Sequence, residues 1–134
     1  MACPEAAERT VAAIAGQMLR ALSDRCSTAI YTARGSATQD FKAERAQAVG
    51  EALSRLFREA VRHAGQHRVI FAGGDTSSFA MRATGAYAME IAGSTGRQAS
   101  HVCRLLAEGE LNGAEVILKG GQAGGDQFFL RPLL

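Results

Sequence analysis

Apolar residues recur at helical spacing in two segments of this chain. The first segment follows Pro4, a residue that a first helical turn tolerates, and the second ends before Gly65, which is expected as the C′ residue that stops a helix. We therefore predict two amphipathic helices, each of which buries one face. Their apolar stripes are Val11, Ile14, Ala15, Met18, Leu19 and Leu22 in the first helix, and Val49, Ala52, Leu53, Leu56, Phe57, Ala60 and Val61 in the second.

Short apolar runs predict strands at residues 28–32, 69–72, 86–91 and 115–119, while the polar stretches 34–38 and 93–98 are interpreted as a loop and a linker. A short helix is expected from Phe79 to about Thr84, where Gly85 stops it. Residues 69–91 then follow the order of a βαβ unit, in which a right-handed crossover places neighbouring strands parallel. The predicted fold is a three-layer α/β/α domain with a mostly parallel or mixed central sheet.

Two glycine-rich turns each directly follow an apolar run, at residues 71–77 and 118–126. Glycine lacks a Cβ, so backbone N–H groups can approach an anion closely, and a helix that starts after the turn adds partial positive charge. Nucleotide binding at the carboxyl edge of the sheet is therefore the leading hypothesis. The candidate binding residues are Gly73, Gly74, Asp75, Thr76 and Ser77 in the first turn, and Lys119, Gly120, Gly121, Gln122, Gly124 and Gly125 in the second.

Neither turn matches a common phosphate-binding signature, so a plain tight turn is an equal interpretation of each glycine pair taken singly. Lys119 enters the second turn, where its ammonium would either reach a phosphate or face solvent. Asp75, Thr76 or Ser77 is expected to cap the following helix. Asp75 is also the candidate ligand for Mg²⁺ or its water shell, and the cap and the metal contact both stay open for it.

Composition narrows the classes of function. The chain has 134 residues, 47% apolar and 21% charged, which is ordinary for one globular domain. Its net charge is +2, with 15 basic residues scattered among 13 acidic ones, which argues against a nucleic-acid partner. No apolar stretch reaches the length of a bilayer span and the N-terminus has no signal-peptide pattern, so we expect a cytoplasmic protein without a membrane partner.

The cysteines and histidines form no familiar metal-binding motif. The cysteines are interpreted as reduced thiols, with Cys26 and Cys103 as small buried side chains rather than nucleophiles. His63 and His67 flank the expected end of the second helix, where a cation is favourable, and a metal or general-base role is disfavoured for them.

The two glycine motifs occur in a particular order. Ala72-Gly-Gly-Asp-Thr-Ser-Ser78 precedes Ile117-Leu-Lys-Gly-Gly-Gln-Ala-Gly-Gly-Asp-Gln-Phe-Phe129, with Tyr31-Thr-Ala-Arg-Gly35 ahead of both. This combination resembles the C-terminal nucleotide-binding domain of the four-carbon acid sugar kinases, from about Thr28 to Phe129. Members of that family have an N-terminal α/β domain that binds the sugar acid and a C-terminal one that binds ATP, and they phosphorylate threonate, erythronate or their oxo relatives.

The resemblance implies that residues 1–134 form a single domain, most of the C-terminal domain of such a kinase, and that the substrate domain with its catalytic base is absent. It also implies backbone contacts to the nucleotide from both glycine turns. Two features depart from the family pattern: a Gly-Ser-x-Ser turn is missing, and residues 94–98 stand where the family has a Pro-Gly-x-Pro loop.

The chain alone is therefore expected to bind ATP with Mg²⁺ weakly and not to turn over, because phosphoryl transfer depends on alignment with an acceptor that the missing domain would hold. The alternative is a non-catalytic binding or assembly module, in which the glycine turns are structural and the apolar helices pack against a partner. A homo-oligomer is then expected, since a missing domain leaves apolar area exposed.

Overall fold

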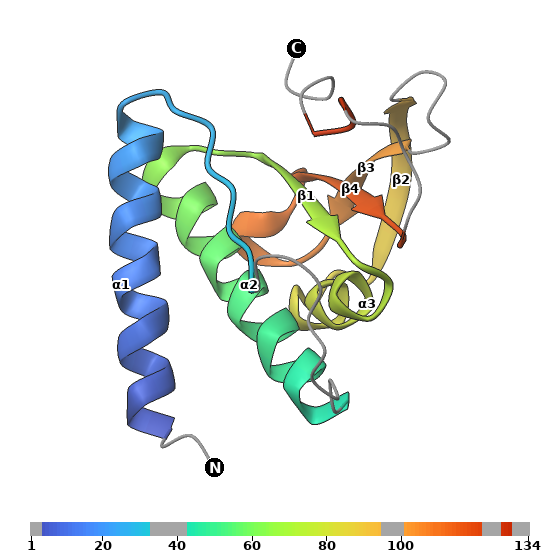
Figure 1. Ribbon diagram of the computed structural model, residues 1–134. Helices are drawn as coiled ribbons and strands as arrows, with labels where there is room; N and C mark the ends of the chain where they lie inside the picture. Colours follow the sequence, from blue (N-terminus) through green and yellow to red (C-terminus); the bar gives the residue numbers. More distant parts are fainter. Residues whose placement is uncertain (1–3, 33–42, 95–100, 122–126, 130–134) are drawn as a thin grey trace.

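The computed structural model describes residues 4–32, 43–94, 101–121 and 127–129, and Figure 1 shows their arrangement. Helices and strands pack into one α/β unit, which confirms the predicted class. The elements are α1 (Pro4–Ser23), α2 (Ala43–Ala64), β1 (Arg68–Ala72), α3 (Gly74–Ala83), β2 (Ala88–Ser94), β3 (His101–Leu106), the short 3-10 helix η1 (Gly109–Leu111) and β4 (Glu115–Lys119).

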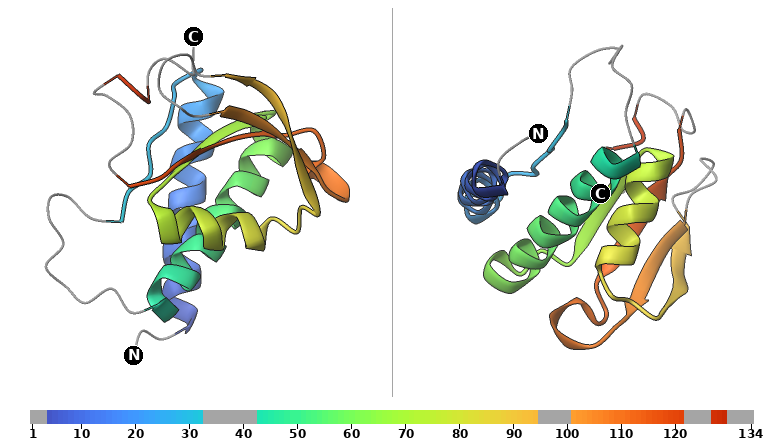
Figure 2. Two further views of the ribbon diagram at one scale, coloured as in Figure 1. Left: turned by 90° about the vertical axis from the view of Figure 1, so that its right-hand side faces the viewer. Right: turned by 90° about the horizontal axis from the view of Figure 1, so that it is seen from below.

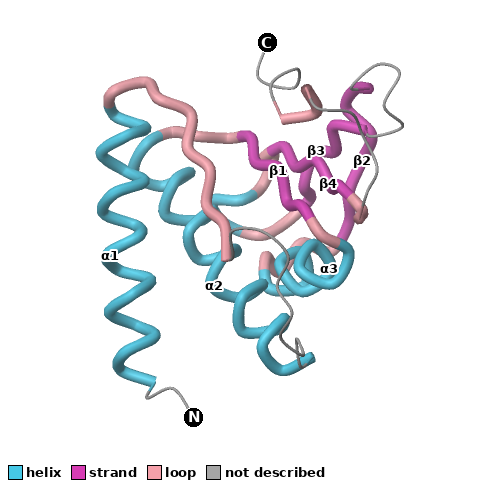
Figure 3. The backbone as a smooth tube through the Cα atoms, in the orientation of Figure 1, coloured by secondary structure: helices cyan, strands magenta, loops and turns pink. Residues whose placement is uncertain are grey.

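The four strands form one mixed sheet in the order β1-β4-β3-β2, drawn in magenta in Figure 3. β1 and β4 are parallel, whereas β3 is antiparallel to both β4 and β2. The strands of the expected βαβ unit, β1 and β2, therefore point the same way but are not neighbours, because β4 and β3 lie between them. This order makes β4 the neighbour of β1 and brings the ends of these two strands together.

The sheet packs on α2 and α3, and α1 packs on α2 as an outer layer (Figure 2). Phe57 of α2 meets Phe71 of β1 edge-on, with ring centroids 6.0 Å apart, at the centre of the core. Burial of such large apolar side chains is the main stabilising term of the domain. The buried core cluster consists of Phe57, Val61, Phe71, Ala80, Leu105, Ala107, Leu111, Ala114 and Val116.

The predicted helix stops Gly65 and Gly85 are confirmed, both with positive φ. At the end of α2 the chain turns back at Gly65, and the Gln66 N–H donates to the carbonyl of Ala60. α1 ends in a Schellman cap, in which the Cys26 N–H donates to the carbonyl of Ala21 and Arg25 takes the left-handed conformation at φ 58°. The apolar stripe of α1 packs on α2 around Met18 and Leu56, in a cluster separate from the main core.

α2 and α3 approach each other closely at Gly50. A Cβ built on Gly50 would lie 2.5 Å from the Cβ of Phe79 and 2.7 Å from the backbone N of Ala80. Real Cβ atoms do not occur at such distances, so only glycine permits this approach of the two helices. α2 therefore sets the position of α3, and with it the position of the first glycine turn.

The strands differ from the prediction in three places. Residues 26–32 are a loop that runs beside α1 and α2 (Figure 1), although 28–32 was predicted as a strand. Its β-branched residues find no strand to pair with among the described residues, and Ile30 instead packs half-buried against the α1–α2 cluster. β3 was not predicted, since its polar residues alternate poorly with its apolar ones, and Gly93 and Ser94 belong to β2 rather than to a linker. The expected loop 34–38 and residues 95–98 lie outside the described residues.

Candidate functional site

The two glycine turns leave the sheet side by side. Ala72, the last residue of β1, is in register with Lys119, the last residue of β4. The next N–H along the chain, that of Gly73, donates to the carbonyl of Lys119 over 2.9 Å. Because the two strands are parallel, both turns begin at the same carboxyl edge.

Gly73 is the N-cap of α3, with φ 98° and ψ 131°. This left-handed backbone is strained for any residue with a side chain. Its carbonyl accepts the first helical hydrogen bond, from the Ser77 N–H at 2.8 Å. The glycine thus turns the chain from strand to helix within one residue.

α3 begins at Gly74, earlier than the predicted start at Phe79, so Asp75, Thr76 and Ser77 lie inside its first turn. The expectation that one of these side chains caps the helix is wrong, since the cap is Gly73 and makes no side-chain hydrogen bond. The N–H groups of a first helical turn have no partner within the helix. Those of Gly74, Asp75 and Thr76 therefore face the carboxyl edge beside the second turn.

Space is open above this first turn. A Cβ built on Gly74 would meet no heavy atom of the described residues within 4 Å. Asp75 is exposed, and its carboxylate makes no hydrogen bond or ion pair within the described part of the chain. Mg²⁺ prefers oxygen ligands, so the Asp75 carboxylate is a suitable ligand for that ion or for its water shell. Phosphate oxygens would supply other ligands.

Ser77 has a different position from the other residues of the first turn. Its side chain is 6% exposed, and its Oγ donates to the carbonyl of Phe71 in β1 over 3.1 Å. A hydroxyl held in this way ties the start of α3 to the end of β1. Ser77 therefore positions the turn through its side chain, while only its backbone belongs to the turn surface.

Lys119 folds back over the second turn. Its Nζ donates to the carbonyl of Gly121 at 2.9 Å and lies 5.5 Å from the ring centroid of Phe128 and 6.0 Å from that of Phe129. The two phenylalanines were not among the predicted site residues, although they are the last two residues of the second glycine motif. Gln122, Gly124 and Gly125, which were among them, lie outside the described residues.

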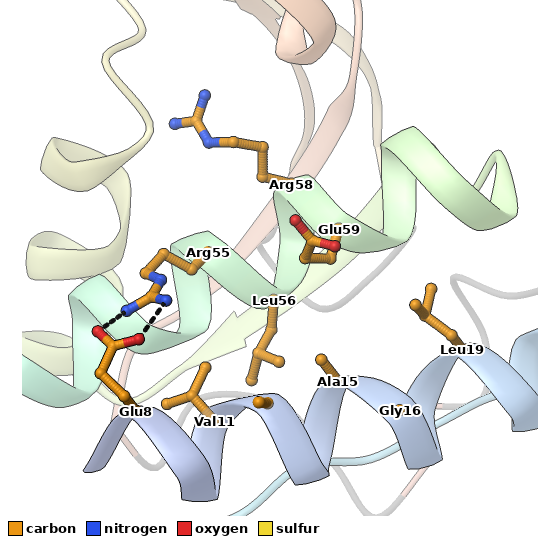
Figure 4. Close-up of a pocket in the computed structure, with 10 residues that line it drawn as sticks. Glu8, Val11, Ala15, Gly16, Leu19, Arg55, Leu56, Arg58 and Glu59 are labelled. Carbon is orange, nitrogen blue, oxygen red and sulfur yellow. Dashed lines mark hydrogen bonds and ion pairs between the residues drawn. The ribbon is translucent and has the colours of Figure 1, made fainter. Parts of the chain in front are cut away.

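A groove lies between α1 and α2 (Figure 4), and none of its lining residues belongs to a glycine turn. It has a volume of about 510 Å³ and an apolar floor that includes Val11, Ala15 and Leu56. At one end Glu8 and Arg55 form two hydrogen bonds, of 2.8 and 3.0 Å. These bonds hold the pKa of Glu8 below its ordinary value and raise the pKa of Arg55.

The cysteines and histidines contribute no site in the described part of the chain. Cys26 is exposed, contrary to the expectation of burial, because it follows the helix cap at the surface; Cys103 is half-buried against the core, and both are free thiols. His63 lies in the last turn of α2, as predicted, with its Nε2 3.3 Å from Glu59. The described residues contain no group of three or more candidate metal ligands. None of the described helices has the length and apolar character needed to cross a bilayer.

A mixed α/β sheet with two glycine turns side by side at its carboxyl edge has the architecture of a nucleotide-binding domain. The family comparison agrees, since residues 1–129 match the family described as the nucleotide-binding C-terminal domain. The chain belongs to that family. No curated protein matches it.

Two crystal structures of a protein from Bordetella bronchiseptica share the fold. Both are described as a domain of unknown function with bound citrate, in a domain-swapped dimer. They are 21% identical to this chain, with TM-scores of 0.61 and 0.60. The matches cover 92% and 95% of this chain but only 30% and 35% of the chains compared. This chain thus spans about a third of the length of those proteins.

Proposed function

We propose that this chain binds ATP with Mg²⁺ at the carboxyl edge of β1 and β4, as the nucleotide-binding part of a kinase for a four-carbon acid sugar of the threonate, erythronate or oxo-tetronate type. The observation that carries the ATP site is the hydrogen bond of 2.9 Å from the Gly73 N–H to the Lys119 carbonyl, which joins the two glycine turns. The family match supports nucleotide binding, and the motif order in the sequence supports the kinase.

In this proposal each group of residues at the carboxyl edge has its own role. Backbone N–H groups of Gly74, Asp75 and Thr76 bind the phosphates, aided by the positive end of α3. Asp75 contacts Mg²⁺ or its waters, and the ion neutralises phosphate charge when it is bound. Lys119 exchanges the Gly121 carbonyl for a phosphate oxygen, which is a stronger, charge-assisted partner.

The acceptor is bound elsewhere in this proposal. A second domain, in the same or another chain, holds the sugar acid and the catalytic base, and the 134-residue chain alone does not turn over. The proposed compartment is the cytoplasm, where ATP is available. The short coverage of the solved structures supports a longer working protein.

Calorimetric titration with ATP and ADP, with and without Mg²⁺, tests the nucleotide site. Gly74→Val places a side chain in the open space above the first helical turn of α3, and it does not require a positive φ. We therefore expect this variant to stay folded and to lose saturable nucleotide binding. Gly73→Val is expected to do the same but adds backbone strain at φ 98°. Gly85→Val is the matched control, because it carries similar strain at φ 71° beyond the far end of α3. Wild-type affinity in a folded Gly74→Val variant would contradict the site.

A second candidate is an assembly module. Large exposed apolar residues occur at every second position in the edge strand β2 and directly before it. They are Tyr87, Met89 and Ile91, which are 74%, 46% and 70% exposed. Exposed apolar residues on an open strand edge favour association with another chain. We expect native mass measurement over a range of concentrations to show a homo-oligomer, and a monomer throughout would count against this candidate.

A further inference from the structure

The face of the sheet that is turned away from α2 and α3 changes in character along the strands. Near the start of β1, charged side chains stand in register across all four strands, and they form ion pairs between β1 and β4 and between β2 and β3. On the same face, the next row of side chains toward the carboxyl edge is apolar. It includes Ile117, which is fully buried. The charged row is Arg68, Glu115, Arg104 and Glu90.

Phe128 and Phe129 lie over the apolar end of this face. Leu118 packs against the core on the helix side, so Lys119, the next residue of β4, points to the opposite side. The ring centroids of Phe128 and Phe129 lie 5.5 and 6.0 Å from the Lys119 Nζ. In Figure 1 this C-terminal piece, in red, lies across the sheet from α3.

The two rings have different environments. Phe128 is 1% exposed, and it meets Phe129 edge-on with centroids 5.6 Å apart. Phe129 is 48% exposed. A buried ring thus holds an exposed ring in place beside a lysine, one strand end away from the first turn of α3.

We propose that Phe129 stacks on the base of the bound nucleotide, while Lys119, beside it, binds the phosphates. This inference rests on the proposed function. An aromatic base has an apolar face and the phosphates carry negative charge, and an exposed ring next to an ammonium offers a partner for each. Because the strand ends are adjacent, a nucleotide with its phosphates at Gly74 and Asp75 extends over the edge toward Phe129.

Stacking on an aromatic ring tolerates different bases. Phe129 therefore raises affinity for nucleotides over inorganic polyphosphate but does not select adenine over guanine. Removal of the ring should weaken ATP binding by about fivefold to a hundredfold, the range found for single base–aromatic stacks. It should leave tripolyphosphate binding unchanged within about twofold, since that ligand has no base.

The test measures ATP, GTP and tripolyphosphate binding to wild type, Phe129→Ala and Phe129→Leu by calorimetry. Phe129→Leu keeps apolar volume without an aromatic face, and circular dichroism checks that both variants fold. Phe129→Trp supplies a fluorescence readout, because the chain contains no tryptophan. ATP and GTP should quench this fluorescence and tripolyphosphate should not. The control is Tyr87→Trp, because Tyr87 is exposed and precedes β2, which β3 separates from β4. No ligand should quench the fluorescence of this control.

Each outcome has a distinct meaning. Failure of the wild-type chain to bind ATP overturns the proposed function, and this inference with it. Wild-type ATP affinity in folded Phe129→Ala overturns only the stacking role of Phe129. An equal loss of ATP and tripolyphosphate affinity also overturns it, because the ring would then act on the phosphates or on the fold. A loss confined to ATP and GTP supports it.

Discussion

Two glycines inside helices should respond to alanine in opposite ways. Gly16 lies in α1 and Gly50 in α2, and an interior Gly→Ala change stabilises a helix by about 1 kcal/mol. At Gly16 the new Cβ would lie 3.7 Å from the Nη1 of Arg20, an ordinary contact with the end of a flexible side chain. Gly16→Ala should therefore raise the free energy of unfolding by about 1 kcal/mol and Tm by about 4 °C.

At Gly50 the same Cβ would overlap α3. It would lie 2.5 Å from the Cβ of Phe79, 2.7 Å from the N of Ala80 and 2.8 Å from the carbonyl carbon of Phe79, where carbon contacts normally start near 3.5 Å. Relief requires α2 and α3 to separate by roughly 1 Å. Overpacking of this kind costs about 1–3 kcal/mol, and backbone atoms place it at the upper end. After the helix-propensity gain, Gly50→Ala should lose about 2 kcal/mol.

Urea unfolding followed by far-UV circular dichroism measures both changes in one assay. The displacement of α3 should also weaken ATP binding by folded Gly50→Ala, since Gly74 and Asp75 begin that helix. Gly16→Ala should bind as wild type. If Gly50→Ala is as stable as Gly16→Ala, the close approach of α2 and α3, and the control of α3 by α2, are wrong.

The remaining predictions use the same unfolding assay. Ser54 Oγ is buried without a hydrogen-bond partner among the described residues, so Ser54→Ala should be neutral or stabilising, and a loss above about 1 kcal/mol would reveal a missed partner. Ser77→Ala removes the bond to the Phe71 carbonyl and should cost about 1 kcal/mol and lower ATP affinity, whereas an unchanged affinity would remove Ser77 from positioning. Arg25→Gly relieves φ 58° after α1 and should stabilise by about 1 kcal/mol; a destabilised variant would contradict that cap. The pKa of Glu8 is lowered in the folded state, so the advantage of wild type over Glu8→Gln should be present above the ordinary glutamate pKa of about 4.3 and vanish as pH falls through the lowered pKa; a difference that persists at pH about 2 would refute the ion-pair origin.

Local signals in the sequence identified most of the helical structure. Apolar spacing predicted α1 and α2, and Gly65 and Gly85 marked helix ends, because positive φ is a local property that glycine permits. The continuous apolar run before Gly73 predicted β1, because such a run is also a local property of the sequence. The beginning of α3 was placed too late, since Gly73 itself makes the turn and no polar cap signals it.

Contacts between distant residues were not available from such patterns. Nothing in residues 28–32 distinguishes a paired strand from an extended loop, because the difference is whether a partner strand lies alongside. β3 was missed for the converse reason, since neighbouring strands stabilise a segment whose own alternation is weak. The close approach at Gly50 likewise depends on α3, which is distant in the sequence.

By itself, the sequence determined the α/β class, the amphipathic helices and the two glycine-rich turns, because these depend on residue type and short-range spacing. Only the tertiary structure decided that β4, not β2, lies beside β1, which brings Gly73 within 2.9 Å of Lys119. The tertiary structure also places the Phe129 ring 6.0 Å from the Lys119 Nζ, and α2 holds α3 in place through Gly50. The physical reason is that hydrogen bonding between strands and packing between helices join residues far apart in the chain, and local propensity carries no information about such partners.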